Sequence, residues 1–385
     1  MNWLRHCETV KTISFRTGTS LLWAAILATL ATWLTPLNAS ESQEWPVAIK
    51  SECELIAHEI DGPEDLALMG HSTLVVSHTD RWKKDSKENG LCRIDIGADS
   101  DECLPMEYAS GTTELAAPHG IFATGYPRNE LVAIDHPVPE KSRIHRYELR
   151  GGKLAQIHDP IDLKDRNAND LVIDSLGRIF FSSPPGEGTS AWKMLSALLG
   201  FKRSAVYMVP SDLDGFDIEE ADPICPRLRY PNGVALDDRN RLFIADSIAG
   251  RLYMLDQVKT SGLEQRCWAV SSLPGGDNIS ASEARAFSGM IVVGHPSLWK
   301  FARYGYKREG CSPSTVYAVS DDGSRTAKIL KLSGKETFRE SRGNGPKRPF
   351  CAGSSAILTD RFLYVGQVFG AGVLRCPVFF QEDES

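Results

Sequence analysis

A short pattern that recurs along the chain limits its fold more than any other feature. One copy is Pro231-Asn232-Gly233-Val234-Ala235-Leu236, which leads through a polar turn to Leu242-Phe243-Ile244-Ala245-Asp246. A polar tip, an apolar strand, a turn and a second apolar strand make the pattern of a β-hairpin. Further copies begin near Gly62, Pro118, Ala168, Gly276 and Gly353. The copies are separated by about 45 to 75 residues, which predicts an all-β, six-bladed β-propeller.

The repeat also predicts where its polar tips lie. The start of the first strand and the end of the second share one edge of a hairpin, and the innermost strands of a propeller line a central channel. The tips are therefore expected at one mouth of that channel. Five tips carry Glu64-Asp65, His119, Asn169-Asp170, Asn232 and Asp277-Asn278, the sixth carries Ser354 and Ser355, and strand ends add His78, His136 and His295.

The N-terminal segment has the pattern of a secretory signal. Basic residues precede an apolar stretch at residues 21–34, and small Ala39 follows at an expected cleavage point. The stretch is short for a membrane span, and an uncleaved leader that anchors the chain is the alternative. Residues 1–39 are thus expected to be a signal peptide or leader helix, and residues 40–385 one propeller domain. The expected localisation is the secretory pathway or the outside of the cell.

The cysteines fit that localisation. Cys7 lies in the leader, and the remaining eight form an even set, which is typical of disulfides in a secreted protein. Cys53 precedes the first blade and Cys376 ends the last strand, so a bond between them would close the ring. Cys92 and Cys103 could form a local pair. Counting does not give the pairing of the rest, and a zinc cluster is disfavoured because no C-x-x-C pair is present.

Three segments interrupt the repeat. Residues 81–90 form a charged loop that could cover the mouth or simply connect two strands. Residues 190–201 have a helical pattern, and this helix could act as a lid, rest on a lipid surface or pack on the propeller rim. Residues 333–349 are polar and suggest an exposed insertion. The net charge of −7 comes without a basic stripe, so nucleic acid is not an expected partner.

The tips carry side chains that suit a hard cation. Carboxylate and amide oxygens from four blades would converge, and Ca²⁺ accepts several such ligands in irregular geometry. Each residue alone is more often a turn residue, but five at equivalent positions predict a site. These five are Glu64, Asn169, Asn232, Asp277 and Asn278. Asp65 and Asp170 point to the opposite side of the strand and could bind a deeper, structural Ca²⁺ with backbone oxygens near Ile121.

Histidines complete the expected site. His119 and His136 should approach each other across one hairpin, where one imidazole could take a proton from water and the other could support it. His295 has the same placement in its own blade and is expected to contact the site or the substrate.

These residues, in this order, resemble the paraoxonase/arylesterase family of calcium-dependent lactonases. The resemblance runs between Cys53 and Cys376, and its motifs are Gly62-Pro63-Glu64-Asp65-Leu66, Pro118-His119-Gly120-Ile121, Asn169-Asp170, Asn232-Gly233, Asp277-Asn278-Ile279-Ser280 and Gly294-His295-Pro296. It implies a six-bladed propeller with two calcium ions and a short lid helix at residues 192–201. The loop at residues 81–90 departs from the family in composition.

The resemblance also implies a role for each residue. The catalytic calcium would be held by Glu64, Asn169, Asn232, Asp277 and Asn278. The structural calcium would be held by Asp65 and Asp170, with backbone oxygens of Leu66 and Ile121. His119 and His136 would form the catalytic dyad, and Cys53 and Cys376 the ring-closing disulfide.

The sequence thus predicts a secreted calcium-dependent hydrolase of lactones and aryl esters, a carboxylic ester hydrolase. Calcium would polarise the substrate carbonyl, and His119, supported by His136, would activate water; Asp277 is the alternative base or nucleophile. The expected partner is a small lactone or ester. Two alternatives remain: a non-catalytic, calcium-stabilised binding protein, and a gluconolactonase-like lactonase, in which neither the His119–His136 pair nor the ring-closing disulfide is expected.

Overall fold

A computed structural model describes residues 47–49, 52–83, 89–125, 127–138, 141–185, 204–211, 218–221, 223–256, 267–341 and 346–380. All of them belong to one compact unit, Ser42–Ser385. The predicted leader at residues 1–39 and the predicted lid helix at residues 192–201 lie outside the described residues. No helix in the part described has the length and apolar character needed to cross a bilayer.

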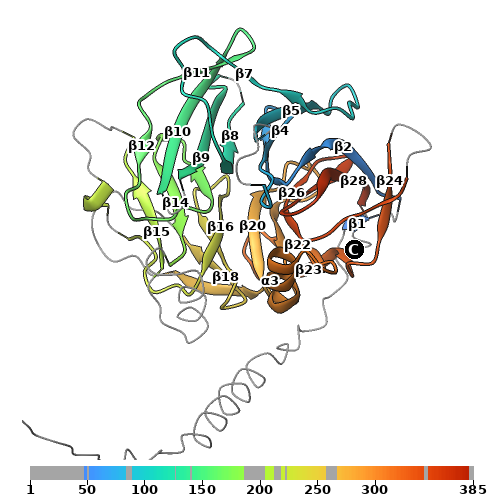
Figure 1. Ribbon diagram of the computed structural model, residues 1–385. Coiled ribbons are helices and arrows are strands. Elements are labelled where there is room, and N and C mark those ends of the chain that lie inside the picture. Colours follow the sequence, from blue (N-terminus) through green and yellow to red (C-terminus); the bar gives the residue numbers. More distant parts are fainter. Residues whose placement is uncertain are drawn as a thin grey trace, which may run out of the picture. The chain divides into compact units, whose positions relative to one another are not determined.

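The strands form six sheets arranged around a central axis, as the blades of a six-bladed β-propeller (Figure 1). The innermost strands are β3 (Pro63–Met69), β8 (Pro118–Ala123), β13 (Leu171–Ile173), β16 (Pro231–Leu236), β20 (Gly276–Ala281) and β26 (Gly353–Leu358). Each contacts the next, and β26 contacts β3, so the six strands close a ring. The predicted fold class is confirmed.

The outer strands complete each blade. The first blade adds β4 (Thr73–His78), β5 (Gly90–Asp95) and β6 (Leu104–Pro105). The second adds β9 (Glu130–Val138), β10 (Lys141–Arg150), β11 (Lys153–Gln156), β7 (Glu107–Tyr108) and β12 (Ile161–Asp162). The third adds β14 (Ile179–Ser183) and β15 (Ala205–Val209). The last three add β17 (Leu242–Asp246), β18 (Arg251–Leu255) and β19 (Trp268–Ser272); β21 (Gly289–Gly294), β22 (Ser314–Ser320) and β23 (Thr326–Leu332); and β27 (Phe362–Gln367) and β28 (Ala371–Phe380).

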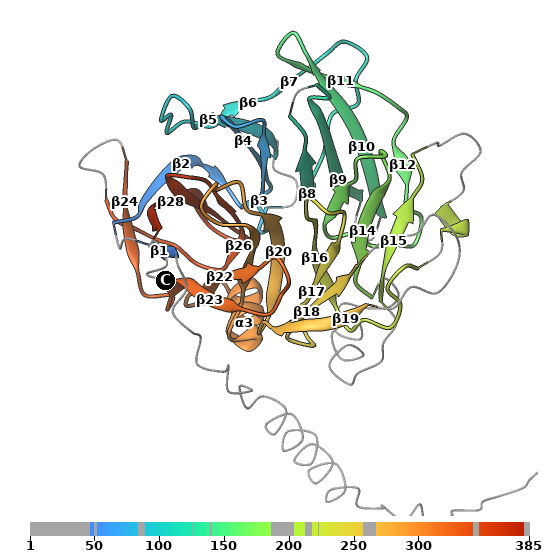
Figure 2. The same ribbon diagram turned by 180° about the vertical axis from the view of Figure 1, so that it is seen from behind.

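The sixth blade joins the two ends of the described chain. Strand β2 (Glu54–Asp61) pairs antiparallel with β28, and β1 (Val47–Ile49) also pairs with β28 (Figure 2). The Cys53–Cys376 disulfide links the same two segments, as predicted. The ring is therefore closed both by strand pairing and by a covalent bond.

The other cysteines form three further disulfides. The Cys92–Cys103 pair is confirmed. The remaining pairs, which counting could not give, are Cys225–Cys267 and Cys311–Cys351. Four disulfides are typical of proteins in an oxidising compartment, such as the secretory pathway or the outside of the cell.

Both faces of a blade pack against neighbouring blades, and this explains the continuous apolar runs in the sequence. Residues of the first blade such as Leu74 and Ile94 share one apolar cluster with Tyr364 and Val373 of the sixth. A strand buried on both sides has apolar residues at successive positions. The polar residues are thereby left to the strand ends and tips.

Two features differ from the sequence interpretation. The segment at residues 333–349 is more than an exposed insertion, because it contains β24 (Thr337–Glu340) and β25 (Arg348–Pro349), which extend the last sheet beyond β2. A helix that the sequence interpretation missed, α3 (Leu298–Lys307), follows the mouth end of β21, with Ser297 as its N-cap. A short 3-10 turn, η1, spans Ile218–Glu220.

Candidate active site

A shift in the pairing register of the two innermost strands of a blade orients the tip side chains at the mouth. In five blades the pairing of the innermost strand with the second strand is interrupted within the first few residues. Such an irregularity bends the strand and re-aims its side chains. The residues in or beside these interruptions are Glu64, His119, Asn232, Asp277, Asn278, Ser354 and Ser355.

Two glycines allow neighbouring tips to approach closely. A Cβ atom on Gly120 would lie 2.6 Å from the carbonyl oxygen of Asn169, and one on Gly233 would lie 2.4 Å from that of Asp277. These distances are shorter than van der Waals contact, and the obstructing atoms are backbone. The His-Gly and Asn-Gly pairs of the sequence therefore bring His119 and Asn232 against the next blade.

Side chains from consecutive blades form one series of polar contacts. His119 Nδ1 lies 3.3 Å from Glu64 Oε2, and His119 Nε2 lies 2.8 Å from Asn169 Oδ1. The amide of Asn169 donates to Asn232 Oδ1, and Asn232 Nδ2 donates to Asp277 Oδ1 at 2.5 Å. Five blades thus contribute to one cluster, as the repeat predicted.

The cluster continues from the fifth blade back to the first. Asn278 Nδ2 donates to Asp65 Oδ1 at 3.2 Å. On the other side of the same tip, His295 Nε2 lies 2.9 Å from Asp277 Oδ2 and its ring packs on Phe301 of α3 with centroids 4.1 Å apart. His295 therefore contacts the site as expected, and the missed helix supports it. The sixth blade adds Ser355, whose hydroxyl donates to the carbonyl oxygen of Glu64 at 2.9 Å.

The donor atoms of this cluster fit calcium. Glu64 and Asp277 offer carboxylates, and Asn169, Asn232 and Asn278 offer amide oxygens. Across the described residues, no group of three or more His, Cys, Asp and Glu side chains has the arrangement of a metal site. A site here would therefore need amide oxygens, which calcium accepts and which are not usual zinc ligands. The role of these residues as calcium ligands stays a prediction.

The deeper carboxylates, Asp65 and Asp170, accept hydrogen bonds from backbone N–H groups. Asp65 accepts the N–H groups of Leu66 and Ile121 at 2.9 and 2.7 Å. Asp170 accepts those of Leu171 and Val234 at 2.7 and 2.8 Å. Within the part of the chain that the structure describes, no Lys or Arg pairs with either carboxylate. The predicted use of the Leu66 and Ile121 carbonyl oxygens as ligands stays a prediction.

Burial makes these carboxylates hard to ionise. It raises the pKa of Asp65, and it raises the pKa of Asp170 together with the negative charge of Asp65. Burial also raises the pKa of Asp277, against the hydrogen bond and charge of His295. A cation beside these groups would favour their charged forms.

Glu64 has the opposite environment because Arg81 reaches it. Arg81 Nε donates to Glu64 Oε2 at 2.7 Å, and the same guanidinium contacts His119 Nδ1. Burial alone would raise the pKa of Glu64, but the charges of Arg81 and His119 outweigh burial and hold it well below its usual range. The sequence marked residues 81–90 only as a charged loop over the mouth, and residues 84–88 lie outside the described residues.

When His119 is neutral, its contact with Arg81 selects the tautomer. A guanidinium can only donate, so Nδ1 of His119 accepts, and Nε2 carries the proton that Asn169 Oδ1 accepts. Both ring nitrogens of His119 are therefore engaged. In this arrangement the lone pair that could take a proton from water faces Arg81.

His119 and His136 lie side by side, as the sequence predicted. Their ring centroids are 5.2 Å apart with the planes at 70°. Burial lowers the pKa of His136 to about 3, with the positive charges of His119 and Arg81 adding to the effect. Ser142 Oγ lies 3.1 Å from His136 Nδ1. His136 is thus a neutral neighbour of His119, and the catalytic role of the pair stays a prediction.

Tyr230 and His78 also lie near the mouth. Burial raises the pKa of Tyr230 to about 12, and the charges of Asp277 and Glu64 add to this, so its phenol keeps its proton near neutral pH. No sequence signal marked Tyr230, because it precedes a tip and belongs to no repeated position. His78 is a strand-end residue whose pKa burial lowers to about 4.

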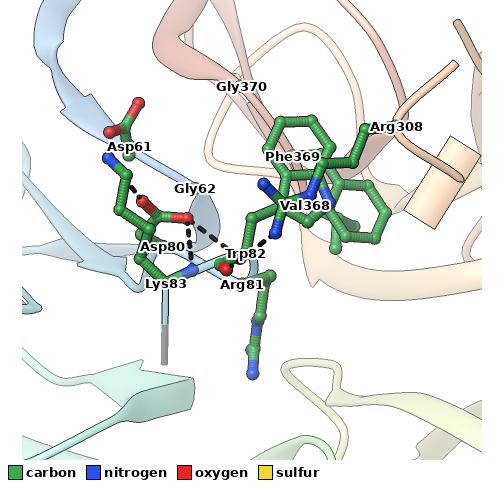
Figure 3. A pocket seen from close by; sticks show the side chains of 10 residues that line it. All are labelled: Asp61, Gly62, Asp80, Arg81, Trp82, Lys83, Arg308, Val368, Phe369 and Gly370. Carbon is green, nitrogen blue, oxygen red and sulfur yellow. Dashed lines mark hydrogen bonds and ion pairs between the residues drawn. The ribbon is translucent and has the colours of Figure 1, made fainter. Parts of the chain in front are cut away.

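A pocket of about 200 Å³ adjoins the mouth where the first blade meets the sixth (Figure 3). Its polar wall includes Asp80, Lys83 and Arg308, and its apolar wall includes Trp82 and Phe369. Trp82 and Phe369 stack on each other with centroids 5.3 Å apart. Arg81 also lines this pocket, and its side chain points away from Trp82, Phe369 and Arg308 (Figure 3).

Comparison with known proteins supports the fold. No family model matches the chain, and no curated protein matches it. Among solved structures, a gluconolactonase from Xanthomonas campestris is 14% identical, with a TM-score of 0.52 over 88% of this chain and 96% of that chain. A luciferin-regenerating enzyme is 12% identical, with a TM-score of 0.49 over 84% and 94% of the two chains. An aldose sugar dehydrogenase from Streptomyces coelicolor, solved with bound PQQ, is 13% identical, with a TM-score of 0.48 over 86% and 98%.

At these identities the likeness concerns the fold alone, and the first of the three structures carries it. The chain is a propeller of the kind found in that gluconolactonase. The resemblance to the paraoxonase/arylesterase family rests on the sequence motifs.

Proposed function

We propose that this chain is a secreted, calcium-dependent hydrolase of lactones and aryl esters. The observation that carries the proposal is the meeting of Glu64, Asn169, Asn232 and Asp277 in one series of contacts that also includes His119. Carboxylate, amide and imidazole groups from five tips far apart in the sequence are expected to meet only if these groups act together. Four disulfides fit secretion.

Two sets of residues would bind the two calcium ions. Glu64, Asn169, Asn232, Asp277 and Asn278 would hold the catalytic calcium, and Asp65 and Asp170 a structural one. A bound calcium ion would polarise the ester carbonyl and stabilise the negative charge that develops on its oxygen.

His119 would take a proton from the attacking water once Arg81 leaves its Nδ1 atom. The neutral ring of His136 would lie beside it. Asp277, hydrogen-bonded to His295, is the alternative base. Tyr230 would keep its proton and could donate a hydrogen bond near Asp277.

A gluconolactonase-like activity is the second candidate, favoured by the similarity to the Xanthomonas campestris structure. A shared propeller does not by itself imply a shared substrate. The His119–His136 pair and the Cys53–Cys376 bond favour the first candidate, since neither is expected in gluconolactonase-like propellers.

The test is a hydrolysis panel on the secreted, full-length chain. Aliphatic lactones, phenyl acetate and an aldonolactone would be assayed in calcium and in EGTA, with bound calcium measured in parallel. We expect calcium-dependent turnover of the first two. Turnover of the aldonolactone alone selects the second candidate, and no turnover with calcium bound makes the chain a binding protein.

Substitution would separate the two candidate bases. We expect His119→Gln to lower kcat about 100-fold or more at saturating calcium, the size typical of losing a general base. If His119→Gln keeps most activity while Asp277→Ala abolishes it with calcium still bound, the base is Asp277.

A further inference from the structure

Arg81 differs from a surface arginine because its side chain is largely buried and its guanidinium lies among the tip side chains. Its side chain is 23% exposed, and its guanidinium contacts both Glu64 and His119 inside the cluster of tips. Glu64 is the only carboxylate that contacts it among the described residues. Neither the fold nor the proposed chemistry requires an arginine at this position.

The backbone beside Arg81 is held firmly. The indole N–H of Trp82 donates to the carbonyl oxygen of Gly305 at 3.3 Å, and Arg308 donates to the carbonyl oxygen of Trp82 at 2.9 Å. Trp82 also stacks on Phe369, and its ring meets that of Tyr304 edge-on. Helix α3 and the sixth blade therefore fix the residue next to Arg81, so the guanidinium enters the mouth from a defined point.

Two other carboxylates, those of Asp61 and Asp80, line the pocket beside Arg81, and neither contacts its guanidinium in the described part of the chain. Asp80 already accepts the N–H groups of Trp82 and Lys83 and pairs with Lys83 Nζ at 3.3 Å. Figure 3 shows Arg81 directed away from this group. If a cation displaces Arg81 from Oε2 of Glu64, the guanidinium charge remains beside His119.

We propose that Arg81 determines specificity by binding a carboxylate on the substrate, so that the preferred substrates are lactones or esters that carry a carboxylate near the ester bond. This inference rests on the proposed function. A guanidinium binds a carboxylate through two parallel hydrogen bonds, which adds geometric selectivity to charge attraction. A substrate carboxylate that draws the guanidinium away also frees His119 Nδ1 to accept a proton, so the substrate that binds best also uncovers the base.

Matched substrate pairs test the specificity. An aryl monoester of a dicarboxylic acid would be compared with the neutral aryl ester of the same length, and a carboxylated γ-lactone with the unsubstituted lactone, all at saturating calcium. We expect the ratio of kcat/KM, charged over neutral, to fall about 10-fold to 100-fold in Arg81→Gln, the size of a charge-assisted pair. Arg81→Lys should restore part of the ratio.

Arg303→Gln is the matched control, because Arg303 is 55% exposed and pairs only with Glu309 at 3.4 Å in the described part of the chain. It should leave the ratio unchanged. An Arg81→Gln ratio equal to that of the wild type overturns the proposal.

A binding measurement separates this proposal from the proposed function. Calorimetry on the calcium-loaded chain would compare glutarate monoamide, which has one carboxylate, with neutral glutaramide. Binding of the carboxylate that weakens at least about 10-fold in Arg81→Gln supports the anion site even if no ester is hydrolysed. If neutral esters are hydrolysed but neither binding nor substrate preference depends on Arg81, the proposed function is supported and the carboxylate-binding role of Arg81 is wrong.

Discussion

Two adjacent carboxylates, Glu64 and Asp65, have opposite surroundings. Glu64 faces the mouth, pairs with Arg81 and His119, and its pKa lies well below the usual range. Asp65 faces inward, and among the described residues its hydrogen bonds come from two backbone N–H groups and one amide. Burial raises its pKa to about 7. Successive residues of a strand point to opposite sides. Glu64, which pairs with Arg81, and Asp65, which has no such partner among the described residues, are therefore neighbours along β3 with different surroundings.

The difference divides the candidate site into two layers. The outer layer contains its own cation, Arg81, whose guanidinium contacts Oε2 of Glu64. The inner layer, Asp65 and Asp170, has no cation of its own among the described residues. An external cation would therefore gain most in the inner layer, and in the proposed function the outer layer would exchange Arg81 for calcium.

The largest expected effect concerns the inner layer. A ligand at about 1,000 times its dissociation constant stabilises a folded protein by about 4 kcal/mol. Replacing Asp170 by Asn should remove most of the difference in the free energy of unfolding between calcium and EGTA. In EGTA the variant should be at least as stable as the wild type, because the repulsion between Asp65 and Asp170 is gone.

Urea unfolding in calcium and in EGTA measures both quantities. Asp238→Asn, an exposed position on the turn between β16 and β17, is the matched control and should keep the full calcium effect. An unchanged calcium effect in Asp170→Asn would show that calcium does not bind in the inner layer.

The second effect concerns the outer layer. Glu64→Gln should lower kcat/KM for a lactone about 100-fold, as for the loss of one preorganised electrostatic contact. In EGTA this variant should lose about 1–3 kcal/mol of stability, because Arg81 is left without its carboxylate. Asp170→Asn and Glu64→Gln should therefore act in opposite directions on the calcium-free protein, and equal shifts would contradict the two-layer arrangement.

A pH series sharpens the comparison further. The folded-state pKa of Asp65 and Asp170 lies above the unfolded value, so the folded protein holds extra protons, and the stability they provide is lost as pH rises through the folded pKa. His136, whose pKa burial lowers to about 3, contributes with the opposite sign. Subtracting the stability–pH curve of the wild type from that of Asp170→Asn cancels the His136 contribution, because both proteins contain this histidine.

In EGTA, the stability of Asp170→Asn relative to the wild type should therefore grow from pH 5 to pH 7, by up to about 1.4 kcal/mol per pH unit. A flat difference would mean that Asp170 ionises normally in the folded chain.

The fold and the meeting of the tips could be predicted because both follow from the repeat. A hairpin that recurs in order fixes which strand ends share a face, so Glu64, His119, Asn169, Asn232 and Asp277 could be grouped without coordinates. The Cys53–Cys376 bond followed from the closure of the ring.

The features that escaped prediction depend on neighbours far away in the sequence. Arg81 belongs to a loop, and its direction is set by Trp82 packing on Phe369 and α3. Helix α3 did leave a local signal, with Ser297 as N-cap and Phe301 and Tyr304 three residues apart. No repeat position marked Tyr230, and the Cys225–Cys267 and Cys311–Cys351 pairs needed the arrangement of the outer strands.

The smallest expected effect tests the exchange between cations directly. Arg81→Gln should tighten calcium binding at the mouth about 10-fold, because a positive charge a few ångström from Glu64 opposes a second cation in a partly solvated site. The calcium stabilisation supplied by the inner layer should stay the same, since Arg81 contacts neither Asp65 nor Asp170 among the described residues. Calorimetric titration should resolve two classes of site, with only one moving. Weaker calcium binding in Arg81→Gln would mean that Arg81 supports the calcium ligands. Arg81 would then not compete with calcium, and the contrast between the outer and inner layers would disappear.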